Sequence, residues 1–274
     1  MSKKSFVHIR TFMVVIVFIL AFTLNYTYAV PGPEGSIIDK IKASGKIIVG
    51  TSADYPPYEF HLLNDPEGEL VGIDVDIAKV IADELGVKLV INDLIFSRIF
   101  KALEMGEIDI AIAGLHPTAE RKKIADFSDI YYQAMQNIII KAEDAEKIKL
   151  IEDLRGMKVG IQKDSIQEDM ARTQIIGAEF VVRETIEELI INLRKGLVAA
   201  VILEKPVADS YVRRNKNFKS IQCKSFDHKL GSAIAVKQGN HTLLKEINRI
   251  LAKLKKEDKI KEFVENAKML TNKR

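Results

Sequence analysis

Two stretches of the chain, "LEMGEIDIAIAG" at residues 103–114 and "LRKGLVAAVILE" at residues 193–204, follow one plan. Each begins in a helical pattern that a glycine ends, and each continues as a short apolar run with the character of a buried strand. When the two stretches are aligned, Gly114 at the end of the first falls on Glu204 at the end of the second. The repeat predicts a molecule with two halves that are built alike.

The sequence around each stretch alternates apolar runs with patterns of helical periodicity. In the first half, residues 46–51 and 87–91 read as strands, residues 74–85 read as a helix, and Ser97 offers an N-cap for a second helix. The strands expected in the second half are residues 157–162, 179–182 and 198–203. Strands that alternate with helices predict α/β units with parallel sheets.

Two helix starts in the second half carry the same local signal. Ser165 precedes Glu168 by three residues, and Thr185 precedes Glu188 by the same spacing. This spacing is typical of a capping box, in which the hydroxyl and the carboxylate each bind a free backbone N–H group of the first turn. We therefore expect helices to begin directly after both hydroxyl residues.

The two halves predict two lobes that face each other across a cleft. We expect lobe 1 to contain residues 36–131 and 230–274, and lobe 2 to contain residues 136–226. The chain would cross to lobe 2 within residues 127–140 and return within residues 226–236. Because functional groups of open parallel sheets gather beyond the carboxyl ends of strands, the cleft is the expected functional site.

Residues 1–29 read as a secretory signal peptide. Basic residues precede an uncharged run at residues 11–24, and Thr27 and Ala29 occupy the small-residue positions of a cleavage site. An uncleaved anchor is the alternative, but a lipid-spanning helix needs about 20 apolar residues. With no cysteine near the cleavage site for lipid attachment, we expect a periplasmic protein.

The charge balance and the cysteine count exclude several classes of protein. Removing the signal peptide lowers the 41 Lys and Arg residues to 38, which equals the number of Asp and Glu residues. A balanced surface without tryptophan has no electrostatic footprint for nucleic acid or an anionic membrane. The single cysteine, Cys223, permits no internal disulfide. No metal-ligand cluster, Gly-rich phosphate loop or catalytic motif appears, so neither a metal nor a cofactor is expected.

Arg121 and Glu204 are the first candidates for a binding site. Arg121 follows the strand end at Gly114, where a guanidinium can hold a carboxylate through two parallel hydrogen bonds. Glu204 ends the matching strand, where it can accept hydrogen bonds from an ammonium group. A solvated arginine and a surface glutamate are the alternatives. Together the two residues suit a zwitterion, which is the form of a free amino acid.

Other candidates lie at the ends of neighbouring strands. Ser165 would cap a helix, and the backbone N–H groups beside it can bind a carboxylate. Tyr55 and Phe96 can form the apolar wall of a pocket, although ordinary core packing also explains them. His116 is expected to be a structural imidazole or one at the edge of the cleft.

Five stretches resemble motifs of the periplasmic amino-acid-binding proteins of ATP-driven importers. They are "VGTSADYPPYEF", "GELVGIDVDIAKVIADELGVKL", "AGLHPTAERKKIADFSDIYY", "DLRGMKVGIQKDSIQED" and "AAVILEKPVADSYV". The likeness extends from about residue 41 to residue 263. It implies the periplasmic-binding-protein fold, in which two hinged lobes close on one free amino acid without catalysis.

The resemblance also implies a role for each candidate residue. Arg121 would hold the α-carboxylate, with help from the backbone near His116 and Ser165. Glu204 and the carbonyl of Gly114 would take the α-ammonium group. The ligand's side chain would be sandwiched by Tyr55 and Phe96 and selected by Ser52 and Gln162.

Several positions depart from the family pattern, and Glu204 and His116 are two of them. Glu204 stands where aspartate is common, and His116 replaces a serine or threonine whose hydroxyl touches the carboxylate. The expected protein is a monomeric receptor that binds a polar or cationic amino acid and delivers it to an ABC transporter permease. The alternative is a cyclohexadienyl or arogenate dehydratase on the same fold, with Glu204 as general acid. A sensor domain is disfavoured, because no second hydrophobic span follows.

Overall fold

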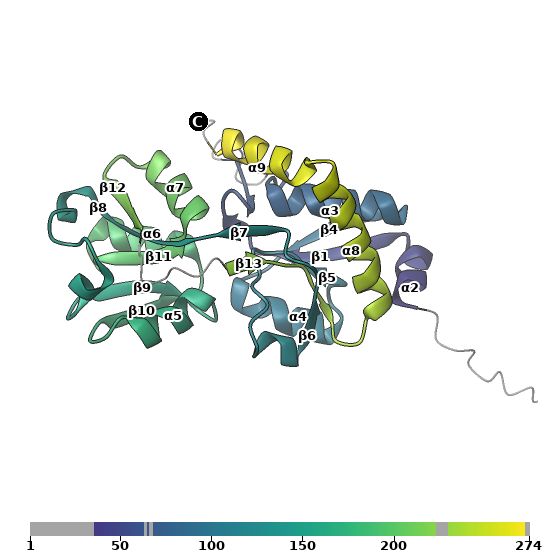
Figure 1. Cartoon of the computed structure of the whole chain (residues 1–274), viewed down its shortest axis with the longest axis horizontal. Helices are drawn as coiled ribbons and strands as arrows, with labels where there is room; N and C mark the ends of the chain where they lie inside the picture. Colours follow the sequence, from purple (N-terminus) through teal and green to yellow (C-terminus); the bar gives the residue numbers. More distant parts are fainter. Residues whose placement is uncertain (1–35, 63–64, 66–67, 223–229, 272–274) are drawn as a thin grey trace, which may run out of the picture. The chain divides into compact units, whose positions relative to one another are not determined.

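The computed structural model describes residues 36–62, 65, 68–222 and 230–271. The predicted signal peptide and Cys223 lie outside these residues. Residues from Ile37 onward form one compact unit, and its strands gather into two main sheets (Figure 1).

The first sheet has the strand order β4-β1-β5-β14-β6. Strand β1 (Lys46–Thr51) pairs in parallel with β4 (Lys88–Asp93) and with β5 (Ile110–Ala111). Strand β14 (Ala235–Lys237) runs antiparallel to both β5 and β6 (Ala125–Phe127). The carboxyl ends of β1 and β5 therefore meet at one edge, as the sequence predicts.

The second sheet repeats this plan with the order β10-β9-β11-β8-β12. Strand β9 (Lys158–Gln162) pairs in parallel with β10 (Glu179–Arg183) and with β11 (Ala200–Glu204). Strand β8 (Gln136–Lys141) is antiparallel to β11 and to β12 (Phe218–Gln222). The predicted α/β fold with two lobes is confirmed, and each lobe contains a mixed sheet.

A narrow ribbon of two short strands lies between the two sheets. Strand β7 (Tyr132–Ala134) leads from the first sheet into β8, and β13 (Leu230–Ser232) leads back into β14. The two strands pair antiparallel to each other (Figure 1). Because β8 and β14 enter their sheets from the opposite lobe, each runs against its parallel neighbours.

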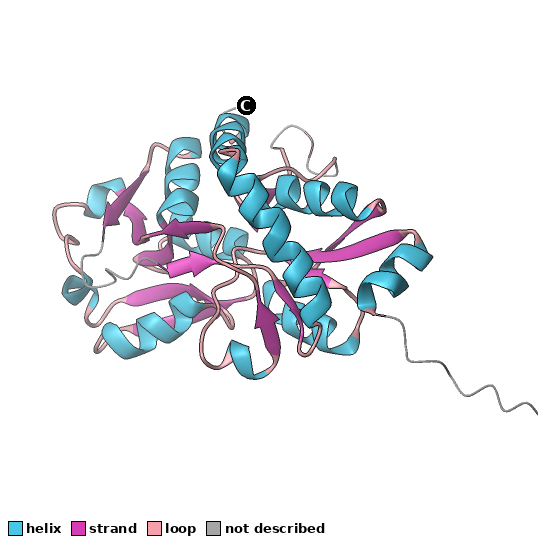
Figure 2. Ribbon diagram, turned by 45° about the vertical axis from the view of Figure 1, so that its right-hand side comes forward, coloured by secondary structure: helices cyan, strands magenta, loops and turns pink. Residues whose placement is uncertain are grey.

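Helices cover both faces of the sheets (Figure 2). The helices of the first half are α2 (Ile37–Ser44), α3 (Ile73–Leu85) and α4 (Ile99–Met105). Those of the second half are α5 (Ile166–Gln174), α6 (Ile186–Lys195) and α7 (Lys205–Arg214). Helix α8 (His241–Lys256) packs on α3, and α9 (Lys259–Leu270) packs on both. Short 3-10 helices include η1 (Phe96–Arg98), η2 (Arg121–Lys123), η3 (Ala142–Asp144) and η4 (Ile151–Leu154).

Strand β11 shows why the sheet ends are buried. All five of its residues are buried, because helices cover both faces of the sheet. Val201 and Leu203 pack into the core that contains α6, while Ala200 and Ile202 pack into a separate core that contains part of α5. Successive side chains of a strand point to opposite faces, which explains this division. Glu204 consequently reaches its position from a rigid, doubly packed strand.

Of the three predicted helix N-caps, Thr185 and Ser165 cap helices and Ser97 does not. Thr185 forms the predicted capping box with Glu188, and Ser165 accepts the Glu168 backbone N–H. The Glu168 carboxylate, however, bonds the backbone N–H of Asp164. The prediction that Ser97 caps a helix was wrong, because its hydroxyl donates to Glu184 at 2.7 Å and α4 begins without a side-chain cap.

Candidate ligand-binding site

A narrow cavity lies among the residues that follow β1, β5 and β9. Most of the predicted ligand-binding residues line it: Ser52, Tyr55, Phe96, Gly114, His116, Arg121 and Gln162. The remaining lining residues are Asp54, Glu59, Ala113, Ile166 and Gln167. The cavity volume of about 10 Å³ admits about one water molecule.

Arg121 is buried rather than solvated. Its side chain is only 9% exposed, and its guanidinium lies 5.6 Å from the ring centre of Phe96 and 5.1 Å from that of Phe100. Nη1 donates to the carbonyl of His116 at 3.2 Å, and Nη2 donates to the carbonyl of Asp164 at 3.0 Å. Burial lowers the pKa of Arg121 to about 10, so the group stays charged at neutral pH.

No carboxylate forms an ion pair with Arg121 in the described part of the chain. Both hydrogen-bond partners of the guanidinium are neutral carbonyl groups, and Asp164 and Asp169 act on it only as nearby charges. A buried charge is costly unless an opposite charge and hydrogen bonds compensate it. The site therefore offers an uncompensated cation to an anionic group.

Glu204, like Ser165, is not among the residues that line the narrow cavity, and it is fully buried at the end of β11. The Tyr58 hydroxyl donates a hydrogen bond to its Oε2 atom. His116 Nε2 lies 2.7 Å from Oε1, which is an ion-pair distance without the alignment of a hydrogen bond. His116 is thus a direct partner of the carboxylate that we expected to take an ammonium group.

Ser165 and Gln162 already have protein partners. The Ser165 hydroxyl donates to the Gln162 carbonyl at 2.7 Å and accepts the Glu168 N–H at 3.2 Å. The Gln162 side-chain amide donates to the Glu184 carbonyl at 3.2 Å. Ser165 is therefore a helix cap, and any contact between Ser165 and a ligand stays a prediction.

The aromatic residues line the cavity from two sides. Tyr55 stacks on Tyr58 with ring centres 5.4 Å apart, while Phe96 lies against the Arg121 guanidinium. Tyr55 also lies near the Gln167 side-chain amide, whose nitrogen is 3.4 Å from the Tyr55 hydroxyl. The sandwiching of a ligand's side chain by Tyr55 and Phe96 stays a prediction.

Sequence reasoning missed Asp54, which is almost completely buried. Its Oδ2 accepts the backbone N–H of Ile186 at 2.6 Å, at the first turn of α6. The Tyr211 hydroxyl donates to its backbone carbonyl at 2.9 Å. Burial raises the pKa of Asp54 to about 7. The signal was its position shortly after the first strand, in a segment where we considered only Ser52 and the aromatic residues.

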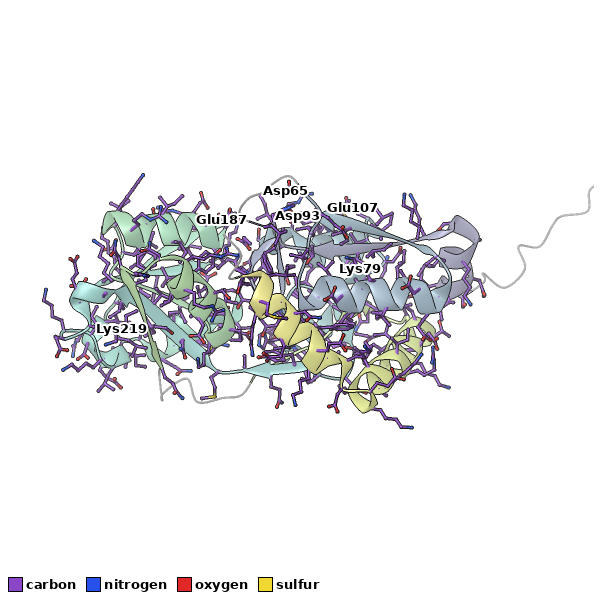
Figure 3. The ribbon with its side chains drawn as sticks, turned by 90° about the horizontal axis from the view of Figure 1, so that it is seen from above. Asp65, Lys79, Asp93, Glu107, Glu187 and Lys219 are labelled. Atoms are coloured by element: carbon purple, nitrogen blue, oxygen red, sulfur yellow. The ribbon has the colours of Figure 1, made fainter. Side chains whose placement is uncertain are left out.

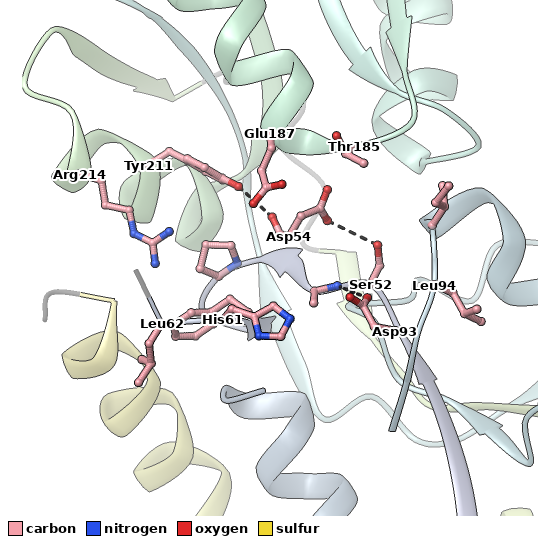
Figure 4. Close-up of a pocket in the computed structure, with 14 residues that line it drawn as sticks. Ser52, Asp54, His61, Leu62, Asp93, Leu94, Thr185, Glu187, Tyr211 and Arg214 are labelled. Atoms are coloured by element: carbon pink, nitrogen blue, oxygen red, sulfur yellow. Dashed lines mark hydrogen bonds between the residues drawn. The ribbon is translucent and has the colours of Figure 1, made fainter. Parts of the chain in front are cut away.

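A larger cavity of about 480 Å³ adjoins the first and shares Ser52 and Asp54 with it. Asp93 lines this cavity from the first sheet, and Glu187 lines it from α6. Figures 3 and 4 label both carboxylates. Arg214 also lines the cavity, with its guanidinium over the ring of Phe60. The shared residues make this cavity a continuation of the narrow site.

The described residues form neither a membrane-spanning helix nor a metal-ligand cluster. Every helix in the described part of the chain is too short or too polar to cross a membrane. These same residues contain no group of three or more His, Cys, Asp or Glu side chains arranged to hold a metal ion.

Two lobes with polar groups converging at the strand ends define the class of solute-binding proteins. Residues 47–267 match the family described as bacterial extracellular solute-binding proteins, family 3, and the chain belongs to this family.

Two relatives from Bacillus subtilis align with most of the chain. The arginine-binding extracellular protein ArtP of Bacillus subtilis is 34% identical over 223 residues, which cover 77% of this chain and 85% of ArtP. The ABC transporter glutamine-binding protein GlnH of the same organism is 34% identical over 227 residues, which cover 81% of each chain.

A solved structure of an amino-acid-binding protein is also similar to this chain. The substrate-binding protein AbpA of an amino acid ABC transporter from Streptococcus pneumoniae, bound to L-arginine, is 33% identical with a TM-score of 0.83. The match covers 86% of this chain and 100% of AbpA. The predicted membership among amino-acid-binding proteins of ABC transporters is confirmed. These relatives are binding proteins, so the assignment to a non-enzymatic protein is also confirmed.

Proposed function

We propose that this protein is a periplasmic receptor that binds a free amino acid with a cationic side chain, arginine in particular, and delivers it to an ABC transporter permease. The observation that carries the proposal is the buried guanidinium of Arg121, which has no carboxylate partner among the described residues. An α-carboxylate would supply the missing charge and accept the two parallel hydrogen bonds that a guanidinium offers.

The α-ammonium group would bind on the opposite side, at Glu204 and the Gly114 carbonyl. Glu204 is engaged by Tyr58 and His116, but a carboxylate has about four lone-pair sites and can accept further bonds. Gly114 lines the same cavity as Arg121. The two ends of a zwitterion would thus meet opposite charges.

The ligand's side chain would extend into the larger cavity. Asp54, Asp93 and Glu187 give this cavity several carboxylates, which favour a guanidinium or ammonium group over a neutral amide. The relatives include both an arginine-binding and a glutamine-binding protein, so homology alone leaves this choice open. The acidic lining supports arginine.

Binding would require the lobes to separate. An amino acid is far larger than a cavity of about 10 Å³, and direct contacts such as Arg121 Nη2 to the Asp164 carbonyl join the two lobes beside it. The ribbon of β7 and β13 joins the sheets through short strands, and it is the natural hinge. Closing the lobes around a ligand would create the surface that a permease recognises.

Thermal unfolding of the purified protein, refolded to remove carried-over ligand, tests the proposal against each of the twenty amino acids. Arginine at 100 times its dissociation constant should add about 2.7 kcal/mol and raise the midpoint by a few degrees. Agmatine lacks the α-carboxylate and norvaline lacks the guanidinium, so both should shift the midpoint much less. A protein that no amino acid stabilises would overturn the proposal.

A further inference from the structure

Glu59 is a buried acid for which the proposed ligand contacts give no role. It lies in β3 (Glu59–Phe60), is fully buried and lines the narrow cavity. Neither of its carboxyl oxygens receives a hydrogen bond from a donor in the described residues. The carboxyl group of Asp74, in the first turn of α3, is its neighbour, because the Asp74 backbone N–H donates to the carbonyl of Tyr58, the residue before Glu59, at 3.0 Å.

Asp74 has donors on both of its oxygens. The Gly114 backbone N–H donates to Oδ2 at 2.8 Å, and the Tyr131 hydroxyl lies 2.8 Å from Oδ1 and 2.9 Å from Oδ2. Donors on both oxygens stabilise the ionised form of a carboxyl group. Asp74 is therefore suited to carry the negative charge of the pair, and Glu59 is not.

The ionisable groups around Glu59 and Asp74 do not stabilise a second negative charge on this pair. The other ionisable groups that act on Glu59 are Asp54 and Asp93, and Glu204 acts on Asp74; all of them are acids. No cation pairs with Glu59 or Asp74 within the described residues. Two buried carboxyl groups in contact cannot both ionise, so the pair must retain a proton. Burial raises the pKa of Glu59 well above its ordinary range and that of Asp74 to about 6.

We propose that Glu59 keeps its proton at neutral pH and donates it to Asp74, and that this carboxyl pair positions the turn at Gly114. The second part rests on the proposed function, in which the Gly114 carbonyl contacts the α-ammonium group of the ligand. Glu59 and Asp74 are then positioning residues that act on the ligand through Gly114.

The turn at Gly114 requires such support. Gly114 has φ of 55°, and a Cβ atom there would lie 3.1 Å from the ring of Tyr55. The Asp74 carboxylate holds the N–H of this residue, which lines the cavity. Tyr131 directly precedes β7, so the same carboxylate also holds the segment that leads to the second sheet.

Infrared difference spectroscopy of the ligand-free protein at neutral pH tests the proton directly. The wild-type protein should show the carbonyl absorption of protonated carboxyl groups. Because burial raises the pKa of Asp54 to about 7, the comparison is made in the Asp54→Asn background, where Glu59→Gln should remove the absorption. Glu69→Gln is the matched control, because the Glu69 side chain is 74% exposed and should contribute only a carboxylate. A spectrum of Asp54→Asn without this absorption, or an absorption that Glu59→Gln leaves intact in that background, overturns the proposal.

Calorimetric titration with arginine tests the positioning role. Glu59→Leu removes the donor to Asp74 and should weaken binding about tenfold, as expected for a lost hydrogen bond to a charged group. Glu59→Gln keeps an N–H donor and should recover most of that loss. Equal losses in both variants would overturn the role assigned to the proton.

The amide resonance of Gly114 provides a readout without ligand. It should move in Glu59→Leu and return toward its wild-type position in Glu59→Gln. If the wild-type protein binds no amino acid, the proposed function fails while the infrared and amide measurements still decide the state of the pair. If Glu59→Leu does not fold, the comparison of wild type with Glu59→Gln decides it.

Discussion

His116 Nε2 lies 2.7 Å from Glu204 Oε1, and this contact joins the two sheets. His116 follows β5 in the first sheet and Glu204 ends β11 in the second, and both side chains are almost completely buried. The resemblance to the family predicts a hydroxyl residue at the histidine position. The substitution therefore adds a partner for the buried glutamate, and it ties the lobes together at the site itself.

Replacing His116 should destabilise the protein. In His116→Ala, Glu204 keeps the hydrogen bond from Tyr58 but loses the imidazole 2.7 Å from Oε1, and removing one partner of a buried polar pair costs about 0.5–3 kcal/mol. The free energy of unfolding, measured with urea without ligand, should fall by this amount. His241→Ala is the control, because that side chain is 80% exposed and its removal should cost less than about 0.5 kcal/mol. Equal losses in the two variants would show that the contact with Glu204 stabilises nothing.

Substitutions of Arg121 should weaken ligand binding without unfolding the protein. Arg121→Met removes the partner of a buried carboxylate and should cost about 2–5 kcal/mol of arginine binding in calorimetry. Arg121→Lys should recover only part of this loss, because an ammonium group cannot make two parallel hydrogen bonds. Lys122→Met changes the exposed neighbouring residue and should leave the dissociation constant within about twofold. Normal binding by Arg121→Met would refute the carboxylate assignment.

The parts of the fold that the sequence predicted depend on local interactions. Thr185 and Glu188 are three residues apart and form the predicted capping box. Gly106 and Gly196 end their helices in the left-handed conformation, as the aligned stretches indicated. Such signals need only a few consecutive residues, so they can be read without a structure.

The parts that could not be predicted depend on contacts between distant residues. Ser97 looked like a helix cap, but its partner Glu184 is 87 residues away. Asp54 bonds the N–H of Ile186 across 132 residues. Only the packing of the two lobes brings these groups together, and no local pattern records it.

The pKa of Asp54 predicts how stability depends on pH. This pKa is raised from 3.8 to about 7 by burial, so the folded state holds a proton that the unfolded state releases between these values. Stability without ligand should therefore fall as pH rises from about 4 to 7, by up to about 1.4 kcal/mol per pH unit. Urea unfolding of Asp54→Asn should show a shallower decline than wild type. The decline that remains is assigned to Glu59 and Asp74, whose raised pKa values act with the same sign. Identical pH profiles would mean that Asp54 is ionised in the folded protein.

Asp54 should also release a proton when a cationic ligand binds. At about pH 6 a group with a pKa of about 7 is mostly protonated, and a guanidinium entering the adjoining cavity would lower that pKa. Calorimetry of arginine binding in buffers with different heats of ionisation should detect the release of up to about one proton. Asp54→Asn should abolish the release and weaken arginine binding about tenfold, while Glu187→Gln, which changes an exposed carboxylate, should have a smaller effect. Should arginine bind without proton release in the wild-type protein, its side chain does not approach Asp54, and the cationic specificity must come from elsewhere.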